Sequence, residues 1–416
     1  MELNFKNLKF KIAIVTILIY EMAMLVFKLD GVSIFKLIIT ALVWISFGIA
    51  IVNFFENFTH LKKRIPRLAF IVLMLLIYWN IINIFRSVFF DAGEITTIFG
   101  NVYTSLALLV PFVIIFSTQK INIKVIQVYF KTILKLAAIT FILLFIYSGG
   151  NFSVEQILVI SLLLQPVIFN ITVLPYQNNK YKFFVLFCGA ILFYMSILYS
   201  NRTMMLRELM LLVGLIAVYF YYKFHFKWIL RLSFIFLLLP FLLLKISIDS
   251  GESVIQKYFS KASDSELTTD TRTFLYTELY DDLIENEQLI VGKGANGRYY
   301  SSYFSTEEGD APVRLGMEVG VLTMLLKGGL IAIVLNVLIL ILAIYYAFFK
   351  SNNSYVIGIG YMLFVHTVLL FIDNRIGYTS DNFVIWFYIG VCLSKEIRVM
   401  KNSEIHILLN KKRKSI

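Results

Sequence analysis

The sequence has few of the residues on which many soluble enzymes depend for chemistry. Its 416 residues include 2 cysteines, 4 histidines and 6 prolines, and only 15% are charged. Cys188 and Cys392 both fall inside apolar runs, so no disulfide framework is implied. The cysteines and histidines are widely scattered, without the spacing of metal ligands. We therefore expect neither a metal nor a cofactor.

Apolar residues, in contrast, are abundant, at 59% of the chain with a mean hydropathy of +0.80. Apolar runs of about 17 to 24 residues recur along the whole sequence, and this is the length of a helix that crosses the hydrocarbon core of a bilayer. About twelve such spans are expected, at residues 9–29, 33–55, 68–90, 97–117, 129–148, 154–174, 182–199, 204–222, 227–247, 330–349, 354–372 and 377–394. The predicted fold is an all-α, polytopic membrane helix bundle.

Charge is distributed unevenly along this bundle. Residues 249–312 hold 13 of the 26 acidic residues but only 5 of the 38 basic ones. The remaining basic residues gather in alternate connections, as in Lys62-Lys63-Arg64, and in the C-terminal tail. Cytoplasmic loops are typically rich in Lys and Arg. Both termini are therefore predicted to be cytoplasmic and the acidic loop extracytoplasmic. Orientation explains the basic excess, so no nucleic-acid partner is expected.

Four regions follow from this topology. Residues 1–248 form a nine-helix transmembrane region, and residues 249–315 form the extracytoplasmic loop. Residues 316–394 contain an interfacial helix at 316–327, which ends at Gly328-Gly329, and three further spans. The basic tail at 395–416 favours contact with anionic lipid head groups.

The acidic loop contains a predicted helix from Thr271 to Asn286, because Leu275, Leu279, Leu283 and Ile284 recur at helical spacing. Asp270 is a plausible N-cap, which places Arg272 in the first turn. An arginine at a helix N-terminus suits a phosphate group. Pairing of Arg272 with a nearby carboxylate is the alternative.

Several other residues on the same predicted side are candidates for binding. Arg202 begins the eighth span, and its alternative role is contact with lipid head groups. Gly292-Lys293-Gly294 lacks the pattern of a nucleotide-binding loop, but its backbone could accept an anion. Arg314 and Glu318 lie four residues apart, and pairing with each other is the alternative to a role in binding.

His366 lies within the eleventh span and has the pKa range of a general base, although a buried structural histidine is equally consistent. An extracytoplasmic reaction has no ATP available, so its substrates must be activated already, as lipid diphosphates are. Arginines can stabilise a diphosphate leaving group without a metal.

The chain resembles the superfamily of O-antigen polymerases and O-antigen ligases, which are membrane glycosyltransferases of bacterial polysaccharide assembly. Three segments, in the family's order, give this resemblance: Leu198-Tyr-Ser-Asn-Arg202-Thr, Thr271-Arg272-Thr followed by Gly292-Lys-Gly294, and Glu318-Val-Gly320 followed by Leu-Leu-Lys-Gly328-Gly329. The ligase branch typically has a histidine in the large loop, and this loop has none. The polymerase branch is therefore favoured.

The resemblance implies a metal-independent glycosyl transfer at the outer face of the bacterial cytoplasmic (inner) membrane. Oligosaccharide repeat units on undecaprenyl diphosphate would be polymerised into a surface polysaccharide, such as an O-antigen or a capsule. Arg272 and Arg202 would stabilise the diphosphates, and His366 or Glu318 would accept the acceptor proton. The substrate-binding candidates are Arg207, Gly292, Lys293, Gly294, Arg298, Arg314 and Arg375.

Two alternative functions remain open. The first is an O-antigen ligase that transfers the polymer to lipid A-core, and the second is a flippase for lipid-linked oligosaccharides. Expected partners are the undecaprenyl-diphosphate-linked oligosaccharides, membrane lipids, a chain-length regulator and a separate flippase.

Overall fold

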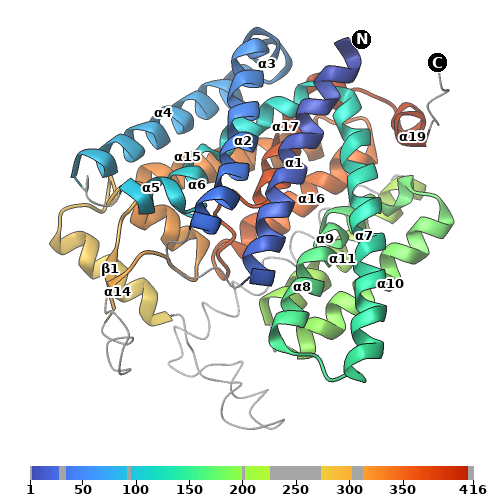
Figure 1. Cartoon of the computed structure of the whole chain (residues 1–416). Coiled ribbons are helices and arrows are strands. Elements are labelled where there is room, and N and C mark those ends of the chain that lie inside the picture. Colours follow the sequence, from blue (N-terminus) through green and yellow to red (C-terminus); the bar gives the residue numbers. More distant parts are fainter. Residues whose placement is uncertain are drawn as a thin grey trace, which may run out of the picture.

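The computed structural model describes residues 2–27, 34–90, 95–198, 202–224, 273–301 and 313–410 (Figure 1). The predicted span at 227–247 and the residues Asp270 and Arg272 lie outside these ranges. The described part is helical apart from one short antiparallel pairing, between β1 (Tyr299–Tyr300) and β2 (Val313–Arg314). This agrees with the predicted all-α membrane bundle.

Long apolar helices form most of the bundle. Seven segments of the described chain are long and apolar enough to cross a membrane. They comprise α2 (Ile34–Glu56), α4 (Arg67–Phe90), α7 (Lys120–Ser148), the succession α8 (Val154–Leu164), α9 (Pro166–Asn170) and η3 (Ile171–Tyr176), α10 (Asn179–Leu198), α11 (Arg202–Phe224) and α15 (Gly320–Phe349). The helix α1 (Glu2–Phe27) packs along α2. Many of these helices leave large apolar side chains exposed, among them Leu143, Phe183 and Val334, as expected for surfaces that contact lipid.

Three predicted spans are shorter than expected. The run at 97–117 is not one helix, because α5 (Ile95–Gly100) ends before a turn, and α6 (Ser105–Leu109) and η2 (Val110–Thr118) follow. The helices α16 (Ser354–Leu369) and α17 (Ser380–Leu393) have 16 and 14 residues. Every residue of α17 is buried. A helix enclosed by other helices meets no lipid, so its length need not match the bilayer.

The acidic loop contains one described helix, α14 (Thr273–Glu285). Leu275, Leu279 and Leu283 are fully buried in a cluster with Leu322 and Leu326 of α15, which confirms most of the predicted apolar stripe. Ile284 does not belong to the stripe, because its side chain is 46% exposed. The helix α14 therefore lies as a cap on the beginning of α15.

Two glycine pairs that are distant in sequence meet beneath this cap. The backbone of α15 is non-helical at Gly329, with φ of 66° and ψ of −166°, so the predicted break is present. The turn at residues 292–294 packs against this kink: Lys293 N–H donates to Leu326 O at 2.7 Å and Gly294 N–H to Lys327 O at 3.0 Å. A Cβ on Gly292 would lie 2.5 Å from Gly329 N. Only glycine permits so close an approach of the two backbones.

Basic segments gather at the end of the bundle opposite the cap. Glu396 of α18 (Lys395–Arg398) forms ion pairs with Arg64 of α3 (Phe58–Arg64), at 3.1 Å, and with Lys120, at 3.8 Å. The C-terminal helix α19 (Asn402–Asn410) lies at this end too, whereas α14 lies at the other (Figure 1). The basic segments that alternate along the sequence thus lie together at one end of the folded bundle. Which end faces the cytoplasm stays a prediction.

Candidate functional site

A group of buried and partly buried charged residues lies at the cap end of the bundle. Asp373, in the connection between α16 and α17, accepts a hydrogen bond from Arg375 Nε at 2.7 Å and lies 3.6 Å from Arg207 Nη2 of α11. Arg375 Nη1 also reaches Asp381 Oδ2, in the first turn of α17, at 3.5 Å. Two arginines and two carboxylates from three segments therefore form one network.

Hydrogen bonds at the beginnings of α15 and α17 fix the connection that contains Asp373 and Arg375. Its backbone is held by the beginning of α15, where Gly320 N–H donates to Asp373 O at 3.1 Å and Val321 N–H donates to Leu370 O at 2.9 Å. The side chain of Thr379 caps α17 by accepting from Asn382 N–H at 3.4 Å. The connection is thus held by backbone bonds to α15 on one side and by the side-chain cap of α17 on the other.

The Arg375 side chain remains a cation although it is partly buried. Burial by itself lowers the pKa of this guanidinium, but the carboxylates of Asp373 and Asp381 more than offset burial, so the pKa is raised above its usual range. A permanent positive charge therefore lies at this point of the bundle.

Among the described residues, Arg207 has fewer hydrogen bonds than Arg375. It is buried, with 5% of its surface exposed. Its Nη2 has no hydrogen-bond partner within the described ranges, because its contact with Asp373 is an ion pair at 3.6 Å. Buried polar groups in folded proteins are nearly always hydrogen-bonded. An unused guanidinium N–H at a cavity wall is a donor that a bound anion can satisfy.

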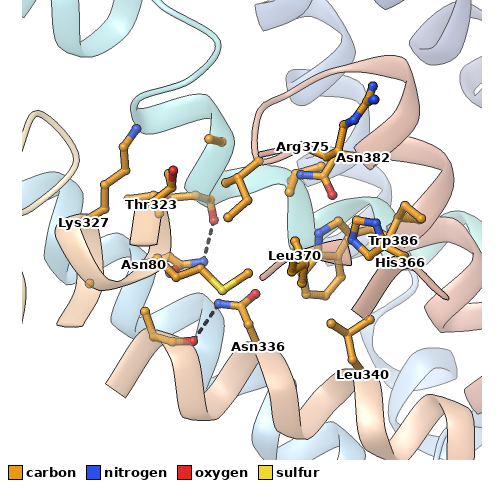
Figure 2. Close-up of a pocket in the computed structure, with 18 of the residues that line it drawn as sticks. Asn80, Thr323, Lys327, Asn336, Leu340, His366, Leu370, Arg375, Asn382 and Trp386 are labelled. Carbon is orange, nitrogen blue, oxygen red and sulfur yellow. Dashed lines mark hydrogen bonds between the residues drawn. The ribbon is translucent and has the colours of Figure 1, made fainter. Parts of the chain in front are cut away.

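Two adjoining cavities lie beside this network. The larger holds about 650 Å³ of empty space, counting its open mouth, and the smaller about 340 Å³. Four residues line both: His366, Arg375, Asn382 and Ile385. Arg207 and Asp381 line only the smaller cavity. Figure 2 shows side chains converging on the larger cavity from α4, α15, α16, α17 and the connections between helices.

The predicted residues His366, Arg207 and Arg375 are therefore brought together. His366 belongs to α16 and lines both cavities, so a molecule spanning the two would pass it. Arg202 is the first residue of α11, five positions before Arg207, but its side chain lies outside the described residues. Arg272 is outside them as well.

The other predicted residues lie away from the cavities. Gly292 and Gly294 pack on the kink of α15, and the backbone N–H groups of Lys293 and Gly294 are already bound there. Lys293 Nζ forms an ion pair with Asp282 at 2.6 Å. Three further residues surround the short β-pairing and do not line either cavity: Arg298, Arg314 and Glu318.

Sequence reasoning missed several residues of the site. Lys327 is buried at the kink of α15, lines the larger cavity and donates to Tyr103 O. A lysine among apolar residues directly before Gly-Gly was the available signal, since ionisable residues within membrane helices are functional candidates by default. Outside the two cavities, Glu21 of α1 accepts a hydrogen bond from Ser380 N–H at 2.9 Å, at the beginning of α17.

Comparison with known proteins finds no family model, no curated protein and no solved structure that matches this chain. The site must therefore be interpreted from its own geometry.

Proposed function

We propose that this protein polymerises oligosaccharide repeat units carried on undecaprenyl diphosphate, by glycosyl transfer at the extracytoplasmic end of the membrane. The observation that supports the proposal most directly is a pair of arginines, the buried Arg207 and the partly buried Arg375, at the wall of a cavity inside a membrane bundle. The resemblance of residues 198 to 390 to O-antigen polymerases adds to it.

The arginines suit a diphosphate for electrostatic reasons. A guanidinium forms paired, charge-assisted hydrogen bonds with phosphate oxygens. In a site with little water, such donors stabilise the charge that grows on a leaving diphosphate. Asp373 and Asp381 hold Arg375 in place, while Arg207 Nη2 keeps a donor for the ligand.

In the proposed reaction, one glycosidic bond forms as one bond to phosphate breaks. A hydroxyl oxygen of the acceptor sugar attacks the anomeric carbon of the donor, and the bond between this carbon and the phosphate oxygen breaks. Undecaprenyl diphosphate leaves with the electron pair. The hydroxyl proton passes to His366, because this side chain faces both cavities.

The test is to incubate purified protein in lipid nanodiscs with lipid-linked repeat units, without nucleotide or added metal. The wild type is expected to give a ladder of products. Arg207→Gln should lower the rate at least about a hundredfold, as for loss of one donor to a developing charge. Arg67→Gln, an exposed arginine at the beginning of α4, is the control with unchanged rate.

The outcomes separate the competing functions. Absence of elongation in the wild type refutes the polymerase. Transfer of preformed polymer to a lipid A-core acceptor would assign the ligase activity. A flippase is the alternative that the location of Lys327 and Arg207 at cavities inside the bundle favours. It would move labelled lipid-linked units between leaflets of a vesicle without lengthening them.

A further inference from the structure

The larger cavity also contains three asparagine side chains to which the proposed reaction assigns no role. Asn80 lies on α4, Asn336 on α15 and Asn382 on α17, and all three line the cavity (Figure 2). They come from three different helices, so their convergence is a property of the tertiary structure.

The orientation of each amide follows from its partner. Asn80 Nδ2 donates to Leu108 O at 2.7 Å, Asn336 Nδ2 to Ala332 O at 2.8 Å and Asn382 Nδ2 to Gly377 O at 2.9 Å. A main-chain carbonyl only accepts hydrogen bonds, so the nitrogen of each amide must face it. The Oδ1 atoms are left as acceptors. Asn80 is 3% exposed, and its Oδ1 has no partner among the described residues.

The charges around the cavity restrict what these oxygens can bind. Arg375 lines the same cavity, and its positive charge disfavours a cation. Amide oxygens in turn repel an anion. The suitable ligand is an uncharged molecule with several hydroxyl donors. Trp386, Leu340 and Ile389 provide apolar walls for its C–H faces.

We propose that Asn80, Asn336 and Asn382 form a carbohydrate subsite that binds the hydroxyl groups of the acceptor sugar. This assignment rests on the proposed function, because it separates the substrate into a sugar at the asparagines and a diphosphate at Arg207. Asn382, Arg375 and His366 line both cavities, so the two parts of the substrate would meet there.

Asn336→Leu is the most informative variant. Within the described part of the chain, the Asn336 amide bonds only within its own helix, to a carbonyl four residues earlier, so leucine removes Oδ1 at similar volume. Asn170 is a matched control, because Asn170 Nδ2 donates to Pro166 O, also four residues earlier, at 2.7 Å and the residue lines neither cavity. Asn336→Ala removes the same oxygen and serves if the leucine variant does not fold.

The experiment measures sugar binding directly, by saturation-transfer NMR on nanodisc protein with methyl glycosides of glucose, galactose, rhamnose and N-acetylglucosamine. Transfer to at least one glycoside is expected with the wild type and Asn170→Leu. It should fall by about tenfold in Asn336→Leu, as for one lost hydrogen bond that leaves a hydroxyl unpaired. No transfer with the wild type, or equal transfer with Asn336→Leu, would overturn the subsite.

Farnesyl diphosphate binding, measured in the same samples, tests the diphosphate site independently of the sugar subsite. The affinity for farnesyl diphosphate should be unchanged in Asn336→Leu and weakened in Arg207→Gln. Sugar binding without any farnesyl diphosphate binding supports the subsite and contradicts the diphosphate site, and the converse result contradicts the subsite alone. In the elongation assay, Asn336→Leu should raise the KM for the acceptor by about tenfold and leave kcat unchanged.

Discussion

Replacing Gly329 by alanine should destabilise the protein strongly, because this glycine allows the cap to dock on α15. At φ of 66° and ψ of −166° the backbone lies in a region that is essentially restricted to glycine. An added Cβ would also lie 2.1 Å from Ile290 O, and this neighbour is backbone rather than a movable side chain. Both effects act at the same position.

The size of the effect follows from these two terms. A residue held in a sparsely populated backbone region costs about 1–3 kcal/mol. Overpacking a well-packed position costs about another 1–3 kcal/mol. The expected loss of about 2–6 kcal/mol is a large part of the free energy of unfolding of a typical protein, which is about 5–15 kcal/mol. The bonds from Lys293 and Gly294 to α15 should weaken with it.

The assay is unfolding in mixed micelles with increasing sodium dodecyl sulfate, followed by circular dichroism. Gly48→Ala is the matched control, because Gly48 lies in the helix α2 and nothing lies within 4 Å of its added Cβ. It should be neutral or stabilising by up to about 1 kcal/mol. If Gly329→Ala unfolds within about 1 kcal/mol of the wild type, the close backbone packing at the kink is refuted.

Three further predictions concern residues that support the site. Leu279→Ala should cost about 2–5 kcal/mol, since this side chain is fully buried beneath the cap, whereas the exposed Ile284→Ala should cost less than about 0.5 kcal/mol in the same unfolding assay. Glu21→Gln keeps an acceptor for Ser380 N–H and should be tolerated, but Glu21→Leu leaves that N–H unpaired and should cost about 1–3 kcal/mol; equal stability of the two would contradict the assigned contact. Burial raises the pKa of the Tyr299 hydroxyl, although the charge of Arg314 opposes it. As pH rises past the usual value of about 10, the unfolded chain therefore loses this proton first and the folded protein loses stability. Tyr299→Phe should show a smaller decline above that pH, and an identical decline would refute this role for Tyr299.

The sequence predicted those features that depend on neighbouring residues. Apolar runs gave the positions of the long helices, such as α7 and α15, because crossing a membrane imposes both length and composition. The leucine stripe of α14 was found in the same way, since helical spacing fixes which side chains share a face. The break at Gly328-Gly329 also followed from local backbone preference.

Errors arose where neighbouring elements decide the outcome. The run at 97–117 was expected to be one span, but its backbone turns after α5, where Val102 O accepts from Tyr378 N–H at 2.9 Å and Phe99 O accepts from Trp44 Nε1 at 2.9 Å. The shortness of α17 could not be predicted, because it reflects enclosure by other helices. Lys327 lay in the predicted interfacial helix at 316–327, whereas in the structure its side chain is buried and donates to Tyr103 O.

By itself, then, the sequence determined a polytopic helical bundle, the sorting of basic segments to one end and three of the residues at the site: Arg207, His366 and Arg375. Only the tertiary structure decided that these three meet, that Asp373 and Asp381 hold Arg375, and that Asn80, Asn336 and Asn382 face one cavity. Periodicity and charge act over a few residues along the chain. The cavity instead depends on how α4, α11, α15, α16 and α17 pack, and such contacts join residues as far apart as Asn80 and Asn382.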